Sequence, residues 1–443
     1  MNRRELLAGA GALTIAGCGE PQQGGQAASS AAASAAGSGG DPFAGAKLMA
    51  DVEAYTGFGT HRSGSAGDIA ASAWFARRWK DLGYQIEQTE FSLPNADTTL
   101  ARLDAGGQSI DGFAQPPLSF TPQGGVTAPL APWNVKSPGD VSGRIAVVHV
   151  PRAAGTPSPS AAYRDAFERA DKAGAVGIIG VISSPSGEVV AINTPAEMFL
   201  ETPVLCVGEK EKARIDAAVA AKQPAKLTIE GPGGFRNGKN TIARRGTAGP
   251  WVVISTPQSG WFTCGGERGP GIAMSLALSE WATSKAFACR FLFVATSGHE
   301  WTDAGAHVFH EFQAPKPKET ALWFHLGASF GARAYEESAA GLKPLETPNL
   351  TRTLMASPDL IASCQAAFAG QPVIEQPAPA DVAKSLGEYT LVLKEGYPTS
   401  AGFWGAHGLF HTLIDGANAT SGAIIEPIAR AVARVIEEKL AKL

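Results

Sequence analysis

Apolar runs and helix-like segments alternate along the C-terminal part of the chain. Three short apolar runs are typical of buried strands, and three longer segments have apolar residues at helical spacing. The strand-like runs are at 251–255, 290–295 and 321–326, and the helix-like segments at 271–283, 302–312 and 424–440. This alternation predicts an α/β fold, with a mostly parallel central sheet, helices on both faces and functional loops at the strand ends.

The same pattern appears earlier in the chain, before a segment with strands of its own. Residues 68–82 predict a helix with Asp68 as its N-cap and an apolar inner face that includes Ile69 and Phe75, and residues 84–91 predict a strand. Further strands are predicted at 143–150, 175–181, 203–207 and 225–229, around a helix at 163–173. We therefore expect an α/β domain from residues 43–100 and 240–443, interrupted by a β-rich inserted domain at 101–239.

The first eighteen residues have the features of an export signal. Arg3 and Arg4 precede an apolar run at 6–16, which is too short to span a bilayer. The start resembles a twin-arginine signal, and Ile15-Ala16-Gly17-Cys18 resembles a lipobox in which Cys18 is acylated. Residues 1–18 thus predict a lipoprotein signal, and a membrane-anchored protein of the cell envelope that faces the periplasm or exterior. A plain secretory signal with an incidental Cys18 is the alternative.

Composition narrows the remaining possibilities. Residues 19–42 are mostly Gly, Ala, Ser and Gln, and predict a flexible linker. The chain has 37 basic and 41 acidic residues without a dense basic run, so no nucleic-acid partner is expected. The other cysteines are widely spaced, which fits buried free thiols better than a disulfide scaffold or a zinc knuckle.

Several segments resemble one family of exported enzymes. The stretches GRIAVVHV, ADKAGAVGIIGV and TPVLCVGEKEKARI resemble a protease-associated domain. The segments HRSGSAGDIAASAWFARRWKDLGYQIE, KNTIARRG, WVVIST and GLFHTLIDGANATSGAIIEPIARAVARVIEEKL resemble zinc aminopeptidases, carboxypeptidase Q and the related glutaminyl cyclases. The resemblance covers nearly the whole mature chain. It implies a zinc-exopeptidase fold with an inserted protease-associated domain, and a peptide or small amide as substrate.

The resemblance also implies where metal ligands should lie, and two of those positions cannot bind a metal here. The family has His-x-Asp where this chain has Thr256-Pro257-Gln258, and an Asp where it has Gly327. The bridging Asp is replaced by Glu267, which is followed by Arg268. These changes predict a degraded site that holds one zinc ion rather than two.

The remaining positions supply a possible set of three ligands. The family's Glu-Glu pair, a base followed by a ligand, is matched by His299 and Glu300, and the last ligand is matched by His411. Three protein ligands are enough for a catalytic zinc. We therefore expect Glu267, Glu300 and His411 to hold one zinc, with His299 as the general base. The alternatives are purely structural roles: a surface ion pair of Glu267 with Arg268, and a hydrogen-bonded buried pair of His299 with Glu300.

Three functional hypotheses follow. The first is an exported peptidase-like hydrolase with a remodelled, mononuclear metal site. The second is a non-catalytic envelope binding protein that keeps the peptidase frame. The third is a metal-free hydrolase or transferase, in which Cys264 in a Gly-rich turn has a lowered pKa and His299 with Glu300 serves as base and orienting group.

Overall fold

The computed structural model of the 443-residue chain describes residues 40–134, 139–196, 200–338 and 341–442. The predicted signal, Cys18 and almost the whole predicted linker lie outside these residues. Within them, no helix is both long enough and apolar enough to cross a bilayer.

The main sheet has eight strands and is mixed. Its order is β1 (Gln85–Pro94), β10 (Phe235–Arg245), β12 (Arg290–Thr296), β11 (Trp251–Pro257), β13 (Thr320–Leu326), β18 (Ser400–Gly405), β16 (Arg352–Ala356) and β17 (Ala378–Pro379). The four central strands from β12 to β18 are parallel, while β1, β10 and β16 pair antiparallel with their inner neighbours. The prediction of a mostly parallel sheet is therefore correct for the centre and for the pair of β16 with β17, but not where β10 and β16 join the central strands or where β1 pairs with β10.

Helices cover both faces of this sheet, as the sequence predicts. Val252 and Ile254 of β11 contribute to one large apolar cluster and Val253 to another, because successive strand residues point to opposite faces. The first face is covered by α1 (Gly45–Thr56), α2 (Ala66–Asp81), α5 (Gly269–Thr283), α7 (Ile361–Ala367) and α9 (Gly422–Leu440). The second is covered by α6 (Ala304–Phe312) and α8 (Tyr389–Lys394).

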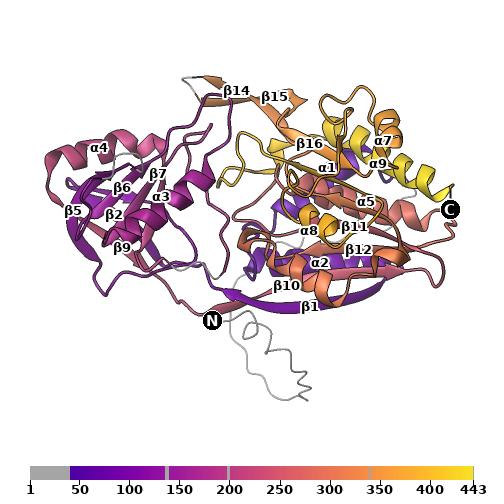
Figure 1. The fold of residues 1–443 in the computed structure, drawn as a ribbon, viewed down its shortest axis with the longest axis horizontal. Helices are drawn as coiled ribbons and strands as arrows, with labels where there is room; N and C mark the ends of the chain where they lie inside the picture. Colours follow the sequence, from indigo (N-terminus) through magenta and orange to yellow (C-terminus); the bar gives the residue numbers. More distant parts are fainter. Residues whose placement is uncertain (1–39, 135–138, 197–199, 339–340, 443) are drawn as a thin grey trace, which may run out of the picture. The chain divides into compact units, whose positions relative to one another are not determined.

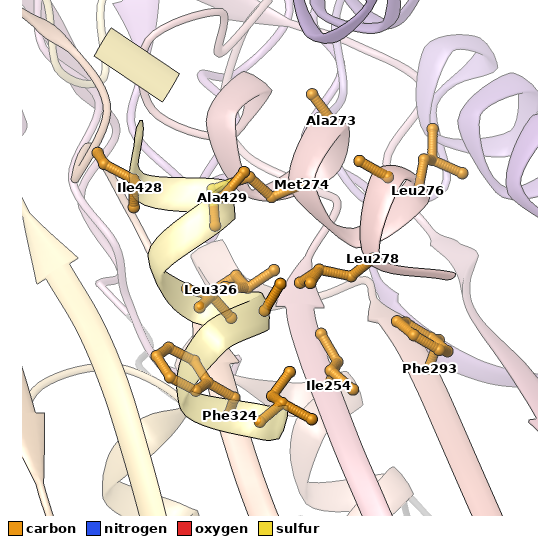
Figure 2. Packing of buried hydrophobic residues seen from close by; sticks show 14 of the residues in the cluster. Ile254, Ala273, Met274, Leu276, Leu278, Phe293, Phe324, Leu326, Ile428 and Ala429 are labelled. Carbon is orange, nitrogen blue, oxygen red and sulfur yellow. The ribbon is translucent and has the colours of Figure 1, made fainter. Parts of the chain in front are cut away.

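The packing on the first face explains why α5 has apolar residues all round. Thirteen of its residues are buried, and a helix that is hydrophobic on every side is typical of a core position. Figure 2 shows Leu278 above Ile254 of β11, with Met274 of α5 beside Ala429 of α9. The N-terminus of α5 is thereby held at the end of β11.

Strands of the middle segment form a second sheet. Its order is β3 (Gln108–Asp111), β2 (Leu100–Ala105), β9 (Pro224–Glu230), β5 (Val126–Trp133), β6 (Ile145–His149), β7 (Gly177–Ile182), β8 (Val204–Gly208) and β4 (Phe113–Ala114). Helices α3 (Ser160–Lys172) and α4 (Lys212–Ala221) pack against it, with separate apolar clusters on the two faces. In the described residues, no strand of this sheet is hydrogen-bonded into the main sheet (Figure 1). We call residues 100–230 the middle segment.

The remaining elements are short and were not predicted. Strands β14 (Arg333–Ser338) and β15 (Gly341–Pro348) form a hairpin. Single turns of 3-10 helix are η1 (Glu209–Glu211), η2 (His299–Trp301), η3 (Pro317–Glu319) and η4 (Ala417–Ala419).

The start of α2 differs from the prediction. Ser65 is the N-cap and accepts a hydrogen bond from the Asp68 backbone N–H, at 3.3 Å. Asp68 lies one turn inside the helix with a fully buried side chain, whereas Ile69, predicted to face the core, is 49% exposed. The predicted N-cap, Asp68, is therefore wrong. Ser and Asp are both favoured at this position, and Ser65, three residues earlier, is the one that caps the helix.

Candidate functional site

The candidate site is built from loops at the carboxyl ends of the central strands. The loop after β11 carries Glu267, the loop after β12 carries His299, and the loop after β18 carries His411. Parallel neighbours end at the same edge of a sheet, so these loops, distant in sequence, come together there.

Glu267 lies between a guanidinium and an imidazole in the protein interior. Its Oε1 is 2.8 Å from Nη2 of Arg268 and 3.2 Å from Nε2 of His411. Glu267 and Arg268 are 0% and 1% exposed. Burial raises the pKa of Glu267, but Arg268 and His411 outweigh it and hold this pKa well below its usual range. The expectation of a surface ion pair is therefore wrong, because the pair is buried and ionised.

These charges are paired without directional hydrogen bonds. Both carboxylate oxygens of Glu267, Nη1 and Nη2 of Arg268, and Nε2 of His411 are buried and have no hydrogen-bond partner. Only Nε of Arg268 is satisfied, by the carbonyl of Ser259 at 2.9 Å. Buried polar groups are nearly always hydrogen-bonded, so a cluster of exceptions marks a place where another group is expected to bind.

The loop that carries Glu267 is held in place by Asp415. Its two carboxylate oxygens accept hydrogen bonds from the backbone N–H groups of Gly266, at 2.7 Å, and Glu267, at 3.1 Å. Gly265 passes so close to the neighbouring loop that a Cβ atom there would lie 2.1 Å from the carbonyl oxygen of Gly416. A larger residue would therefore displace the Glu267 loop.

The middle segment contributes directly to the orientation of His411. The N–H at Nδ1 of His411 donates to the carbonyl of Ala191 at 3.0 Å, and the Ala191 N–H donates to the carbonyl of His411 at 3.1 Å. With Nδ1 engaged, Nε2 is the atom that faces Glu267. The Thr194 N–H also donates to the carbonyl of Glu300, at 3.1 Å. Residues 191–194 thus hold two of the site loops.

Glu300 does not join Glu267 and His411. Its Oε1 accepts from the Ser63 N–H at 2.6 Å, and its Oε2 accepts from the Ser259 hydroxyl at 2.8 Å. Both oxygens are therefore used in holding the N-terminal loop and the loop after β11. The alternative of a hydrogen-bonded buried Glu300 agrees with this geometry, although its partners are serines rather than His299.

The residues at the expected ligand positions do not fit a zinc ion. Arg268 already pairs with Glu267, and Glu300 is committed elsewhere. Gly327 has no room for a ligand side chain, because a Cβ atom there would lie 2.1 Å from the carbonyl oxygen of Phe403. Thr256 donates its hydroxyl to the carbonyl of Leu326 at 2.9 Å. Across the described residues, Glu267, Glu300 and His411 are not among the His, Cys, Asp and Glu groups close enough to share one ion.

His299 has two carboxylate partners that sequence reasoning missed. Its Nδ1 is 2.9 Å from Oδ1 of Asp303 and 3.5 Å from Oε1 of Glu388. Burial and Arg268 lower the pKa of His299, but the two carboxylates raise it to about 9. The expectation that His299 is a general base therefore needs correction, because an imidazole with this pKa carries its proton at neutral pH. Asp303 is four residues away, whereas no local signal identifies Glu388.

Cys264 lacks the properties of a nucleophile. Its side chain is buried, and its sulfur lies 3.4 Å from the carbonyl oxygen of Phe262. Burial and the Glu267 carboxylate raise the pKa of the Cys264 thiol well above its usual range. The expected lowering of this pKa is thus wrong, since desolvation and a neighbouring negative charge both disfavour the thiolate.

A cavity of about 150 Å³ lies beside Phe410, the neighbour of His411 in the chain. It is bounded by Pro157 and Val190 of the middle segment and by His407 and Phe410 of the loop after β18. The Phe410 ring stacks on His411 with centroids 3.8 Å apart. One wall of the cavity is therefore formed by a residue that contacts His411.

Comparison with solved structures relates this arrangement to known proteins. The chain is similar to the zinc aminopeptidase BSAP from Bacillus subtilis, with a TM-score of 0.70 and 15% identity over 90% of this chain and 96% of that one. A peptidase M28 precursor from Shewanella amazonensis gives 0.69 and 14% over 89% and 93%. An aminopeptidase from Aneurinibacillus sp. strain AM-1 gives 0.62 and 15% over 89% and 93%. The chain has the aminopeptidase fold.

Similarity at the level of sequence alone is much weaker. No protein-family model matches the chain, and no curated protein matches it. The aminopeptidase fold is therefore shared while most side chains differ, and the chemistry of this chain has to be argued from its own residues.

Proposed function

We propose that this chain is an exported, peptidase-like hydrolase of peptide or amide bonds, with a remodelled site that holds one metal ion rather than two. The observation that most supports the hydrolase is the buried group of Glu267, Arg268 and His411 at the strand ends of an aminopeptidase fold. Its charges are paired but its polar atoms lack hydrogen-bond partners. A bound substrate would supply the missing partners.

The chemistry follows from the groups present. The Arg268 guanidinium offers positive charge to the oxygen of a polarised carbonyl, which is the usual electrostatic contribution to acyl transfer. The His411 imidazole, whose Nε2 lies 3.2 Å from Glu267, can in its neutral form accept a proton from water and pass it to the leaving amine, while the Glu267 carboxylate stabilises the imidazolium that forms. A metal ion bound nearby, away from the ligand positions that the resemblance implies, would add Lewis-acid polarisation. The middle segment, with its resemblance to a protease-associated domain, would orient His411 through Ala191.

The decisive test is hydrolysis by the full-length chain, solubilised in detergent, on a panel of aminoacyl anilides and dipeptides. We expect turnover of at least one substrate, and a drop of about 100-fold or more in kcat for His411→Asn, which removes proton transfer. His307→Asn, an exposed histidine on α6, is the matched control and is expected to retain activity.

The non-catalytic binding protein is the second candidate, and the enclosure of Glu267 and Arg268 favours it. A site sealed from solvent binds and releases a substrate slowly. If the wild-type chain hydrolyses none of the panel, while a panel peptide still raises its melting temperature, this second candidate replaces the hydrolase.

We also propose that the chain is anchored in the cell envelope through a lipid on Cys18. The support is the lipobox-like ending of residues 15–18 after a twin-arginine-like start. Cys18→Ala is expected to shift the protein from the membrane fraction to the soluble fraction, measured by immunoblotting of fractionated cells. Cys364→Ala, at a buried thiol of α7, is the control. Unchanged partition of the Cys18 variant would contradict the anchor.

A further inference from the structure

A second group of potential metal ligands lies outside the positions that the family resemblance implies. His299 belongs to η2, Asp303 directly precedes α6, and Glu388 directly precedes α8. One ligand atom from each lies within 4.8 Å of the other two. Among the described residues, this is the one His, Cys, Asp and Glu group that meets this condition.

The separations match those of ligands around one ion. Zinc in proteins has ligands at about 2.0–2.1 Å in tetrahedral geometry, so two ligand atoms are about 3.3 Å apart. The distances from Nδ1 of His299 to Asp303 and Glu388, 2.9 Å and 3.5 Å, lie on either side of that value. Nothing has to move far for the three atoms to coordinate a common centre.

The direction of the imidazole points to the same conclusion. Nδ1 of His299 is buried and has no hydrogen-bond partner, although two carboxylates are near. Neither carboxylate oxygen is therefore placed to form a hydrogen bond with Nδ1. An atom placed between the three groups would satisfy all of them, which a single proton on Nδ1 does not do.

A further hydrogen bond orients one of the three ligands. The Thr296 hydroxyl lies 2.9 Å and 2.7 Å from the two carboxylate oxygens of Glu388 and donates to one of them. Such outer contacts orient metal ligands in known sites. The side chains of His299 and Asp303 are 12% and 16% exposed, against 3% for Glu388. His299 and Asp303 thus lie nearer the surface than Glu388 does.

Charge also favours a divalent ion. Asp303 and Glu388 contribute two negative charges, which balance the two positive charges of the ion when His299 is neutral. Arg268, a cation whose charge acts on His299, is already paired with Glu267 at 2.8 Å. We propose that one zinc-like divalent ion binds His299, Asp303 and Glu388, and that the metal site of this chain has moved to this position. The proposal rests on the proposed function only for what the ion does, not for its binding.

The experiment uses the full-length chain in detergent, stripped with a chelator and titrated with Zn²⁺ or Co²⁺. We expect one ion per chain by plasma mass spectrometry, a visible cobalt spectrum of tetrahedral type, and a higher melting temperature with metal. Asp303→Asn and Glu388→Gln are each expected to weaken binding by more than about 100-fold, because even outer-shell changes cost 10–100-fold. Glu311→Gln, exposed on α6, is the control and should bind like the wild type.

Melting temperatures of the metal-free variants separate loss of ligand from loss of fold, and a variant that melts like the metal-free wild type counts as folded. Loss of the ion on Glu267→Gln or Glu300→Gln, with retention in Asp303→Asn, would overturn the proposal in favour of the family-like positions. Failure of the stripped chain to take up an ion, together with hydrolysis of the panel, would overturn the metal site and leave hydrolysis standing. One bound ion without hydrolysis would support the site and refute the proposed enzyme.

Discussion

Replacing Arg268 with alanine is expected to lower the free energy of unfolding by about 3–5 kcal/mol, the usual cost of removing one partner from a buried ion pair. The reason lies in Glu267, which stays fully buried when its guanidinium partner, 2.8 Å away, is removed. His411, on the other side, is then the one basic side chain within ion-pair distance in the described residues. The variant must either keep an unpaired carboxylate in its interior or protonate Glu267.

Urea unfolding followed by tryptophan fluorescence measures this change. Arg434→Ala, on the exposed side of α9, is the matched control and is expected to change stability by less than about 0.5 kcal/mol. The double variant Glu267→Met with Arg268→Met should recover most of the loss, since buried ion pairs can often be replaced by apolar residues without cost. A loss below about 1 kcal/mol in Arg268→Ala would show that the pair is open to water.

Asp68 is expected to make the chain less stable as the pH rises from about 4 to about 7. Its side chain is fully buried in α2 and accepts hydrogen bonds from Gln258 at 2.9 Å and Ser297 at 2.9 Å. Burial raises the pKa of Asp68 from 3.8 to about 7, despite these hydrogen bonds. Between these values the unfolded chain has released the proton and the folded chain still holds it. The stabilising contribution is therefore full below about pH 4 and lost as the pH passes 7.

Asp68→Asn should remove this dependence. A shift of about three pKa units corresponds to roughly 4 kcal/mol, so the variant should gain up to about that much relative to the wild type between pH 3 and pH 8. An acceptor for the added amide is present in Gln258, whose Oε1 is buried and has no hydrogen-bond partner. Asp81→Asn, exposed on the same helix, is the control. Parallel curves for wild type and Asp68→Asn across this range would show that Asp68 ionises like an exposed carboxyl.

The site contains a different kind of positive charge from the one that the family resemblance implies. Where the resemblance implies a metal ion beside a bridging carboxylate, a guanidinium lies beside Glu267. The candidate metal ligands lie at His299, Asp303 and Glu388. In such a hydrolase, a fixed guanidinium and one ion together would stabilise the charges that two metal ions stabilise in a dinuclear site.

The sequence by itself determined the elements of the core. The apolar runs at 251–255, 290–295 and 321–326 became β11, β12 and β13, and the helix predicted at 271–283 became α5 from Gly269. These segments are buried on both faces or all round, so their apolar pattern is continuous and their type can be assigned locally. Exposed or short elements such as β14, β15 and α8 lack that pattern and were not predicted. The N-cap of α2 was also mispredicted, because Ser65 and Asp68 both have side chains that can cap a helix.

The partners of the charged residues were decided by the tertiary structure alone. In the sequence, Glu267 next to Arg268 fits either a surface ion pair or a buried one. The pair is buried because it directly precedes α5, which packs against β11 and α9 in the core. Glu388 reaches His299 only because α8 packs on the second face of the sheet. Burial and long-range contact determine which carboxylates are ionised, paired or free to bind a metal, and neither property is present in the local sequence.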